Sequence, residues 1–135
     1  MRSRRGQALV ELALCVPFVL TLALGSVAVV QIMEAHAGLE AATVAAADAA
    51  VRAPDPITAV KVARQRFMVV VAGYPMRAAT LDISVGGFAR AGELVAASSA
   101  LADVGWLAMG LPERVPLHAR TVLRIEPWRT RRNPP

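Results

Sequence analysis

The sequence has few aromatic residues, a single cysteine and no extended basic face. Phe, Trp and Tyr make up 4% of its 135 residues, and the one cysteine, Cys15, lies inside an apolar run. A lone cysteine excludes an internal disulfide and a cysteine-based metal cluster. Leu14 precedes it, where lipidation would need a small residue. The net charge of +5 comes mainly from arginines near the two ends. We therefore do not expect nucleic-acid binding, which needs a basic face with aromatics among the charges.

The sequence also lacks the patterns that enzymes use. The adjacent Ser98 and Ser99 have no G-x-S-x-G frame. No glycine-rich stretch is followed by the lysine and helix of a phosphate loop. His36 and His118 are far apart, and neither has a companion that suits a metal site or a catalytic base. We expect a protein that is not an enzyme, with no cofactor, metal or small-molecule substrate.

Long apolar stretches, in contrast, are abundant. Hydrophobic residues make up 56% of the chain, and a large share of them precedes Met33. No residue from Leu12 to Met33 is charged. This span of about 22 residues can cross a hydrocarbon core of about 30 Å as a helix. Arg2, Arg4 and Arg5 precede it. They place the N-terminus in the cytoplasm, and the chain after Met33 outside the cytoplasmic membrane.

A cleaved secretory signal is the competing interpretation of this segment. Ala35-His36-Ala37 fits the small-x-small pattern before a cleavage site, which would make Gly38 the first residue of the mature chain. However, the apolar run exceeds the roughly 7–15 residues of a signal core. The pattern also lies within a continuing helical stretch. We therefore favour a transmembrane helix.

The boundary between the arginines and the apolar run has a distinctive order of residues. Arg5 is followed by Gly6, and the fifth residue after this glycine is Glu11. An ionisable residue at the edge of a membrane helix is costly and suggests a functional site. This block, with the apolar run and its early Pro17, resembles the N-terminus of type IV pilin-like proteins. It is most similar to the TadE-like pseudopilins of tight-adherence (Tad/Flp) pili.

The resemblance implies a processing site and an assembly residue. A prepilin peptidase would cut after Gly6 on the cytoplasmic side, leaving Gln7 first, which is closer to the TadE group than to major pilins. Glu11 would then pair with the Gln7 amine of a neighbouring subunit. Glycine lets the scissile peptide approach a protease closely, and two charges that meet at low dielectric can fix axial register. The implied function is that of a minor pseudopilin or assembly component, with other pilins, pseudopilins and platform proteins as partners.

The rest of the chain predicts two further helical segments. Residues 34–53 are rich in alanine, the best helix former. They continue the first helix, either as a stalk or as an amphipathic helix on its own domain. Asp55 caps a second helix from about Ile57 to Ala72, with Pro56 in its first turn. The residues expected on its apolar face are Ile57, Val60, Ala63, Phe67 and Val71.

Alternation of apolar and polar residues predicts strands near residues 80–85, 93–101 and 115–125, so that two or three antiparallel strands cover the second helix. The fold class is α+β. The loop Trp106–Met109 either packs under the sheet or meets the outer leaflet or a partner. Arg129–Arg132 is expected to be a solvated end. The expected segments are a leader (1–6), a transmembrane helix (7–33), a helical stalk (34–53) and an extracytoplasmic head (54–135).

A different class of function also fits part of this pattern. The chain could be a single-pass or signal-exported binding module unrelated to pili. The first residue of the mature chain separates these possibilities: Gln7 favours the pseudopilin, Gly38 an exported module, and an intact Met1 a plain anchor.

Overall fold

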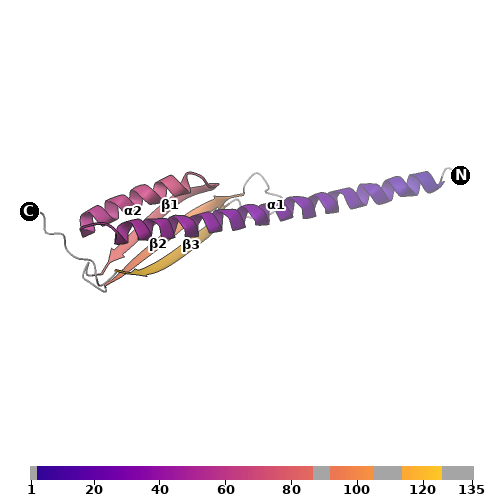
Figure 1. The fold of residues 1–135 in the computed structure, drawn as a ribbon. Coiled ribbons are helices and arrows are strands. Elements are labelled where there is room, and N and C mark those ends of the chain that lie inside the picture. Colours follow the sequence, from indigo (N-terminus) through magenta and orange to yellow (C-terminus); the bar gives the residue numbers. More distant parts are fainter. Residues whose placement is uncertain (1–2, 87–91, 105–113, 126–135) are drawn as a thin grey trace, which may run out of the picture.

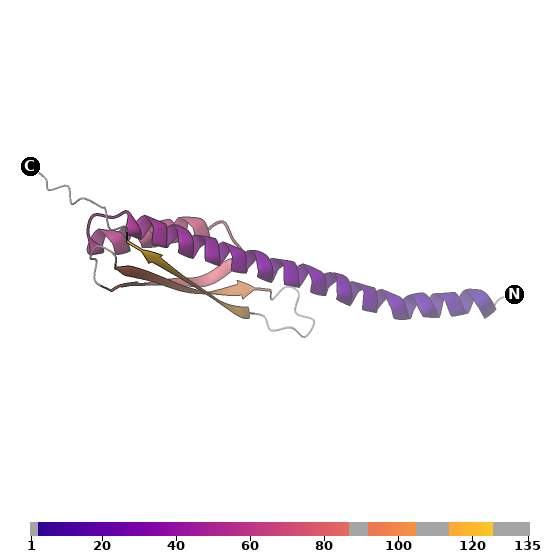
Figure 2. The ribbon, with the colours of Figure 1, turned by 60° about the horizontal axis from the view of Figure 1, so that its bottom comes forward.

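The computed structural model describes residues 3–86, 92–104 and 114–125, with side chains from Gly6 onward (Figure 1). The predicted α+β class is confirmed. The element order is α1 (Ser3–Val51), α2 (Pro56–Val71), β1 (Met76–Val85), β2 (Glu93–Asp103) and β3 (Arg114–Arg124). The N-terminal part of α1 projects away from a small head, and its C-terminal part lies along the sheet (Figures 1 and 2).

The first helix, α1, is continuous across the expected transmembrane segment and the segment 34–53. It has 49 residues, which corresponds to a length of about 73 Å. Pro17 lies inside it, and the hydroxyl of Thr21 donates to the Pro17 carbonyl at 2.8 Å. Pro17 has no N–H to donate to the carbonyl of Ala13, and membrane helices tolerate such a loss where neighbouring groups satisfy the freed carbonyl.

The second helix, α2, begins as the sequence predicts. The carboxylate of Asp55 accepts the backbone N–H of Thr58 at 2.9 Å and its hydroxyl at 2.7 Å, and Pro56 is the first helical residue. The buried stripe consists of Ala59, Ala63 and Phe67, spaced four residues apart. The expectation that Ile57 lies on this face is wrong. Its side chain is 84% exposed, because the first turn points it away from the stripe.

The sheet has three antiparallel strands in the order β1-β2-β3. The expected strands are present, and β1 starts earlier, at Met76. The register of β1 shifts between Arg77 and Thr80, where Ala78 adopts a φ of 51°. The sheet mainly covers α1 through β2 and β3, whereas α2 contacts β1. The expectation that the strands cover the second helix is therefore wrong, because α1 itself supplies the larger apolar face to the sheet.

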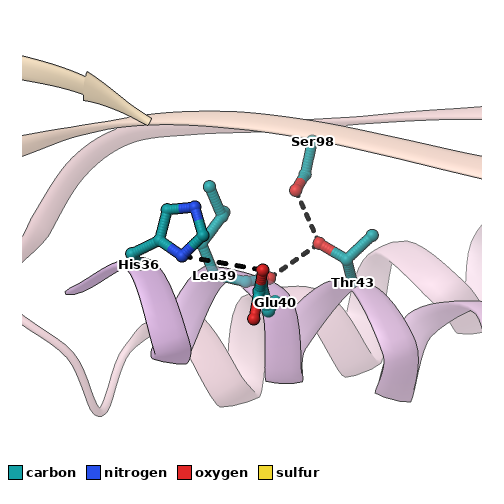
Figure 3. A network of polar contacts seen from close by, with 5 residues as sticks. All are labelled: His36, Leu39, Glu40, Thr43 and Ser98. Carbon is teal, nitrogen blue, oxygen red and sulfur yellow. Dashed lines mark hydrogen bonds and ion pairs between the residues drawn. The ribbon is translucent and has the colours of Figure 1, made fainter. Parts of the chain in front are cut away.

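Small side chains dominate the core between the helices and the sheet. Among the described residues, eight alanines of α1 and α2 and three of β2 are at most 3% exposed, accompanied by a few large residues such as Phe67 and Leu39. A polar contact crosses this core (Figure 3). The Thr43 hydroxyl lies 2.5 Å from the Ser98 hydroxyl and donates to the Leu39 carbonyl at 2.7 Å. Such small residues let a helix lie close to a sheet. The expectations for Trp106–Met109 and Arg129–Arg132 lie outside the described residues.

Candidate functional site: the projecting half of the first helix

The projecting half of α1 exposes its apolar side chains on all sides. Every residue from Gly6 to Ala23 is exposed, and the exposed fractions of Leu9, Leu14 and Phe18 are 67%, 71% and 68%. Within the described part of the chain, α1 is the one helix long and apolar enough to cross a membrane, and only 6% of its most apolar window is buried. A core helix of a soluble protein would be mostly buried, so that explanation does not fit. A signal sequence near the N-terminus would also meet this criterion of length and hydropathy.

The head begins before the expected end of the transmembrane segment. Ala28 is already buried, and Ile32 and Ala35 pack toward the core at the helical spacing. The apolar helix that remains free, from Ala8 to Val27, is about 30 Å long, which matches the hydrocarbon thickness of about 30 Å. Of the two alternatives for the segment 34–53, a stalk or a helix on its own domain, the second fits the structure, because residues up to Val51 lie along the sheet and supply much of the core.

The residues of the expected processing site lie at the free end of this helix. Gly6 belongs to the helix, and a Cβ atom built there would meet no atom within 4 Å. The side-chain amide of Gln7 donates to Oε1 of Glu11 at 3.2 Å, one helical turn away, and both side chains are exposed. Arg4 and Arg5 fall in the first turns of α1, whereas Arg2 lies outside the described residues. The structure therefore brings Gln7 and Glu11 together beside Gly6.

This arrangement gives the carboxylate a partner within its own chain. A lone carboxylate in hydrocarbon is costly, and a hydrogen bond to its charged form lowers that cost. Among the described residues, Gln7 is the hydrogen-bond partner of Glu11. An amide carries no charge, so a cationic amine that reached Glu11 would interact with it more strongly.

The other polar residues singled out in the sequence do not gather into a site. His36 Nδ1 lies 3.6 Å from Glu40 Oε1 on the surface of α1 (Figure 3). His118 is exposed on β3, and Cys15 is an exposed free cysteine on the projecting half. No group of three or more potential metal ligands occurs among the described residues.

Two contacts of the head have no counterpart in the sequence analysis. The ring of Tyr74 packs directly on Gly38, where a Cβ atom would lie 2.4 Å from two ring carbons. Thr43 and Ser98, 55 residues apart, form the buried hydroxyl pair. The sequence signals for these contacts were Gly38 and Thr43 themselves, because both are weaker helix formers than the alanines around them. Their partners depend on the tertiary fold.

Comparison of the chain with protein-family models, curated proteins and solved structures finds no match. The resemblance to pseudopilins thus rests on the arginines, Gly6, Gln7, Glu11 and the apolar run.

Proposed function

We propose that this protein is a minor pseudopilin or assembly component of a Tad/Flp-type pilus. Its first helix crosses the cytoplasmic membrane once, with the N-terminus in the cytoplasm and the head outside. A prepilin peptidase removes residues 1–6. One observation carries the proposal. An uncovered stretch of helix, about as long as the hydrocarbon core is thick, extends from the head and carries Gly6 and Glu11 at its free end.

Cleavage changes the partners available to Glu11. In the uncut chain, the Gln7 amide occupies Oε1 of Glu11. Cutting after Gly6 creates a cationic amine on Gln7, and in an assembly the amine of a neighbouring subunit pairs with Glu11. Such a pair is stable at low dielectric only when both charges meet, so it selects one axial position of neighbouring helices.

The exposed apolar surface suits such an assembly. Because no described part of the head covers residues 6–23, this half of the helix can exchange lipid for other helices on any side. In membranes, helices associate through van der Waals packing rather than hydrophobic burial. When the helix passes from lipid into the assembly, the head would move with it and keep its own core packing.

The Gly6→Ala variant tests the processing step directly. The structure leaves room for a Cβ atom at Gly6, so the fold tolerates alanine and any loss of cutting is due to the peptidase. We expect the wild-type chain, expressed with a prepilin peptidase, to begin at Gln7 by mass spectrometry. We expect at least a tenfold lower cut fraction for Gly6→Ala. Gly25→Ala, which also has free space, is the matched control and should be cut normally.

Two other N-termini would overturn the proposal. An intact Met1 in the presence of active peptidase would indicate a plain anchor. A chain beginning at Gly38 would indicate an exported module. This second outcome conflicts with the packing, because it would remove Ala28, Ile32 and Ala35 from the folded head.

The Glu11→Gln variant tests the assembly step separately. It keeps the size of the side chain and removes the charge, so cutting after Gly6 should persist while co-assembly with other pilins falls. Glu93→Gln, which makes the same change at an exposed carboxylate on β2, is the control. Unchanged co-purification of Glu11→Gln with the pilus components would contradict the assigned role.

A further inference from the structure

The two helices of the head carry opposite charge on their exposed faces. Between Met33 and Val51, α1 has three acidic residues and no Lys or Arg, and α2 has three basic residues and no Asp or Glu. All six side chains are exposed. Asp48 pairs with Arg52 at the end of α1 and Glu40 lies 3.6 Å from His36, but none of the ion pairs within the described residues joins the two sets. The acids are Glu34, Glu40 and Asp48, and the bases are Lys61, Arg64 and Arg66.

Large apolar side chains lie among these charges. On α1, Met33 and Val44 are 66% and 48% exposed, and on α2, Met68 and Val69 are 58% and 63% exposed. We call the three acids with Met33 and Val44 the acidic stripe. On α2, Lys61, Arg64 and Met68 follow at spacings of three and four residues and so share one face, which we call the basic stripe. Exposed apolar residues grouped with charges are typical of a surface that meets a partner.

Parts of both stripes point away from the contact between α1 and α2. Gly38 touches Tyr74, at the end of α2, and Glu40 follows two residues later, about 200° around the helix. On α2, Lys61 lies two residues from both Ala59 and Ala63 of the buried stripe, and so about 200° from each. Glu40 of the acidic stripe therefore faces outward beyond α1, and Lys61 of the basic stripe outward beyond α2.

Two copies anchored in one membrane have their first helices parallel. Within the chain, α1 and α2 lie side by side and run in opposite directions on the same face of the sheet (Figures 1 and 2). When a second copy lies alongside the first, its α2 runs antiparallel to the first copy's α1. This contact repeats the antiparallel packing of α1 and α2 within each chain. Contact between like stripes would instead bring equal charges together, which is unfavourable.

We propose that the acidic stripe of one head binds the basic stripe of a second copy of this chain. The two surfaces differ, so the contact is heterologous. Each added copy leaves one stripe of each kind free, and the row does not close after two subunits. This inference rests on the proposed membrane anchor only for the parallel orientation of the copies. The opposite charges of the two stripes identify a second copy of the chain as the binding partner.

Cysteine cross-linking tests this contact in the full chain. Val44→Cys and Met68→Cys, each in a Cys15→Ala background, are co-expressed with different tags in bacterial membranes that contain a prepilin peptidase. Mild oxidation should yield at least fivefold more of the mixed Val44–Met68 product than of either self-product. Val122→Cys, half exposed on β3, paired with Val44→Cys is the control and should give little product. A dominant Val44 self-product, or a mixed product no greater than the control, would overturn the proposal.

Charge reversal shows whether the stripes recognise each other through charge. Antiparallel helices that place Val44 beside Met68 also place Asp48 level with Arg64, four residues along each helix. Asp48→Lys on the Val44→Cys copy should lower the mixed product several-fold, and Arg64→Glu on the other copy should restore it. A reversal that is not restored would refute the assigned pairing. The N-terminal mass is measured in the same samples. Lost cross-linking with normal cutting after Gly6 overturns this contact alone, and retained cross-linking without cutting overturns the pseudopilin function alone.

Discussion

The two halves of the first helix are both apolar but carry side chains of different size. The projecting half is built from Leu, Val and Phe, which nothing in the described structure covers. The packed half is built mainly from alanine, which is fully buried at 35, 42, 46, 47 and 50. Small residues let the helix approach the sheet and α2, whereas large ones suit lipid and loosely packed neighbours. Hydropathy alone does not distinguish the projecting half from the packed half, but side-chain size does.

The largest effect should come from Phe67, the large buried ring among the described residues. Phe67 is fully buried and Phe18, in the projecting half, is 68% exposed. Phe67→Ala should lower the free energy of unfolding of the head by about 3–5 kcal/mol. Phe18→Ala should change it by less than about 0.5 kcal/mol. Urea unfolding of the full chain in detergent, followed by amide hydrogen exchange of β2, measures both. Similar losses for the two variants would mean that the halves are not separate environments.

The glycines give the next contrast. Gly38→Ala would put a Cβ atom 2.4 Å from the ring of Tyr74, and the base of the ring cannot move aside easily. We expect a loss of about 1–3 kcal/mol from this overpacking. Gly25→Ala meets no atom within 4 Å and should be neutral or stabilise the helix by up to about 1 kcal/mol. The same unfolding assay applies. If Gly38→Ala is restored by Tyr74→Ala, the clash is the cause.

Local sequence patterns account for most of the fold. Asp55 and Pro56 mark the start of α2, and period-two alternation marks the strands, because caps and strand faces depend on neighbouring residues. The sequence did not predict which helix the sheet covers, since α1 and α2 both offer apolar faces. It also did not predict the contact of Gly38 with Tyr74, 36 positions away.

The candidate site also has a part that the sequence predicts and a part that it does not. Gly6, Gln7 and Glu11 are close in sequence, so their grouping at one helix end follows from the helix alone. The bond from Gln7 to Glu11 depends on which rotamers face each other one turn apart, and only the structure shows it. The partner of Glu11 in an assembly belongs to another chain. No pattern within one sequence specifies its position.

The buried hydroxyl pair should contribute less than the ring or the glycine. Thr43 uses its single hydrogen on the Leu39 carbonyl, so Ser98 donates to Thr43. Thr43→Val leaves the Ser98 hydroxyl buried without this partner and should cost about 1–3 kcal/mol. Adding Ser98→Ala should recover most of the loss. Thr21→Val in the projecting half removes an exposed bond and should cost less than about 0.5 kcal/mol. A double variant as unstable as Thr43→Val would show that the pair is not coupled.

The starts of the two helices give the smallest contrast, and it depends on pH. The first turn of α1 has no acidic residue, whereas α2 begins with the Asp55 cap. Hydrogen bonds from the backbone N–H and the hydroxyl of Thr58 hold the pKa of Asp55 below its ordinary value. The folded protein therefore binds this proton less readily than the unfolded chain. The cap contributes its full stability above the ordinary pKa, and this is lost as the pH falls through the lower folded value.

Asp55→Asn separates the cap from its charge. Asparagine also caps helices, but it does not titrate, so the variant should lose this part of the pH dependence while α2 stays protected from hydrogen exchange. In the wild-type chain, exchange in the first turn of α2 should rise as the pH falls below the ordinary carboxyl pKa of about 4. Exchange in the first turn of α1, which has no carboxylate, should lack this transition. If the wild-type and Asp55→Asn chains respond to acid identically, another carboxylate controls the stability of the head, and the two helix starts do not differ as proposed.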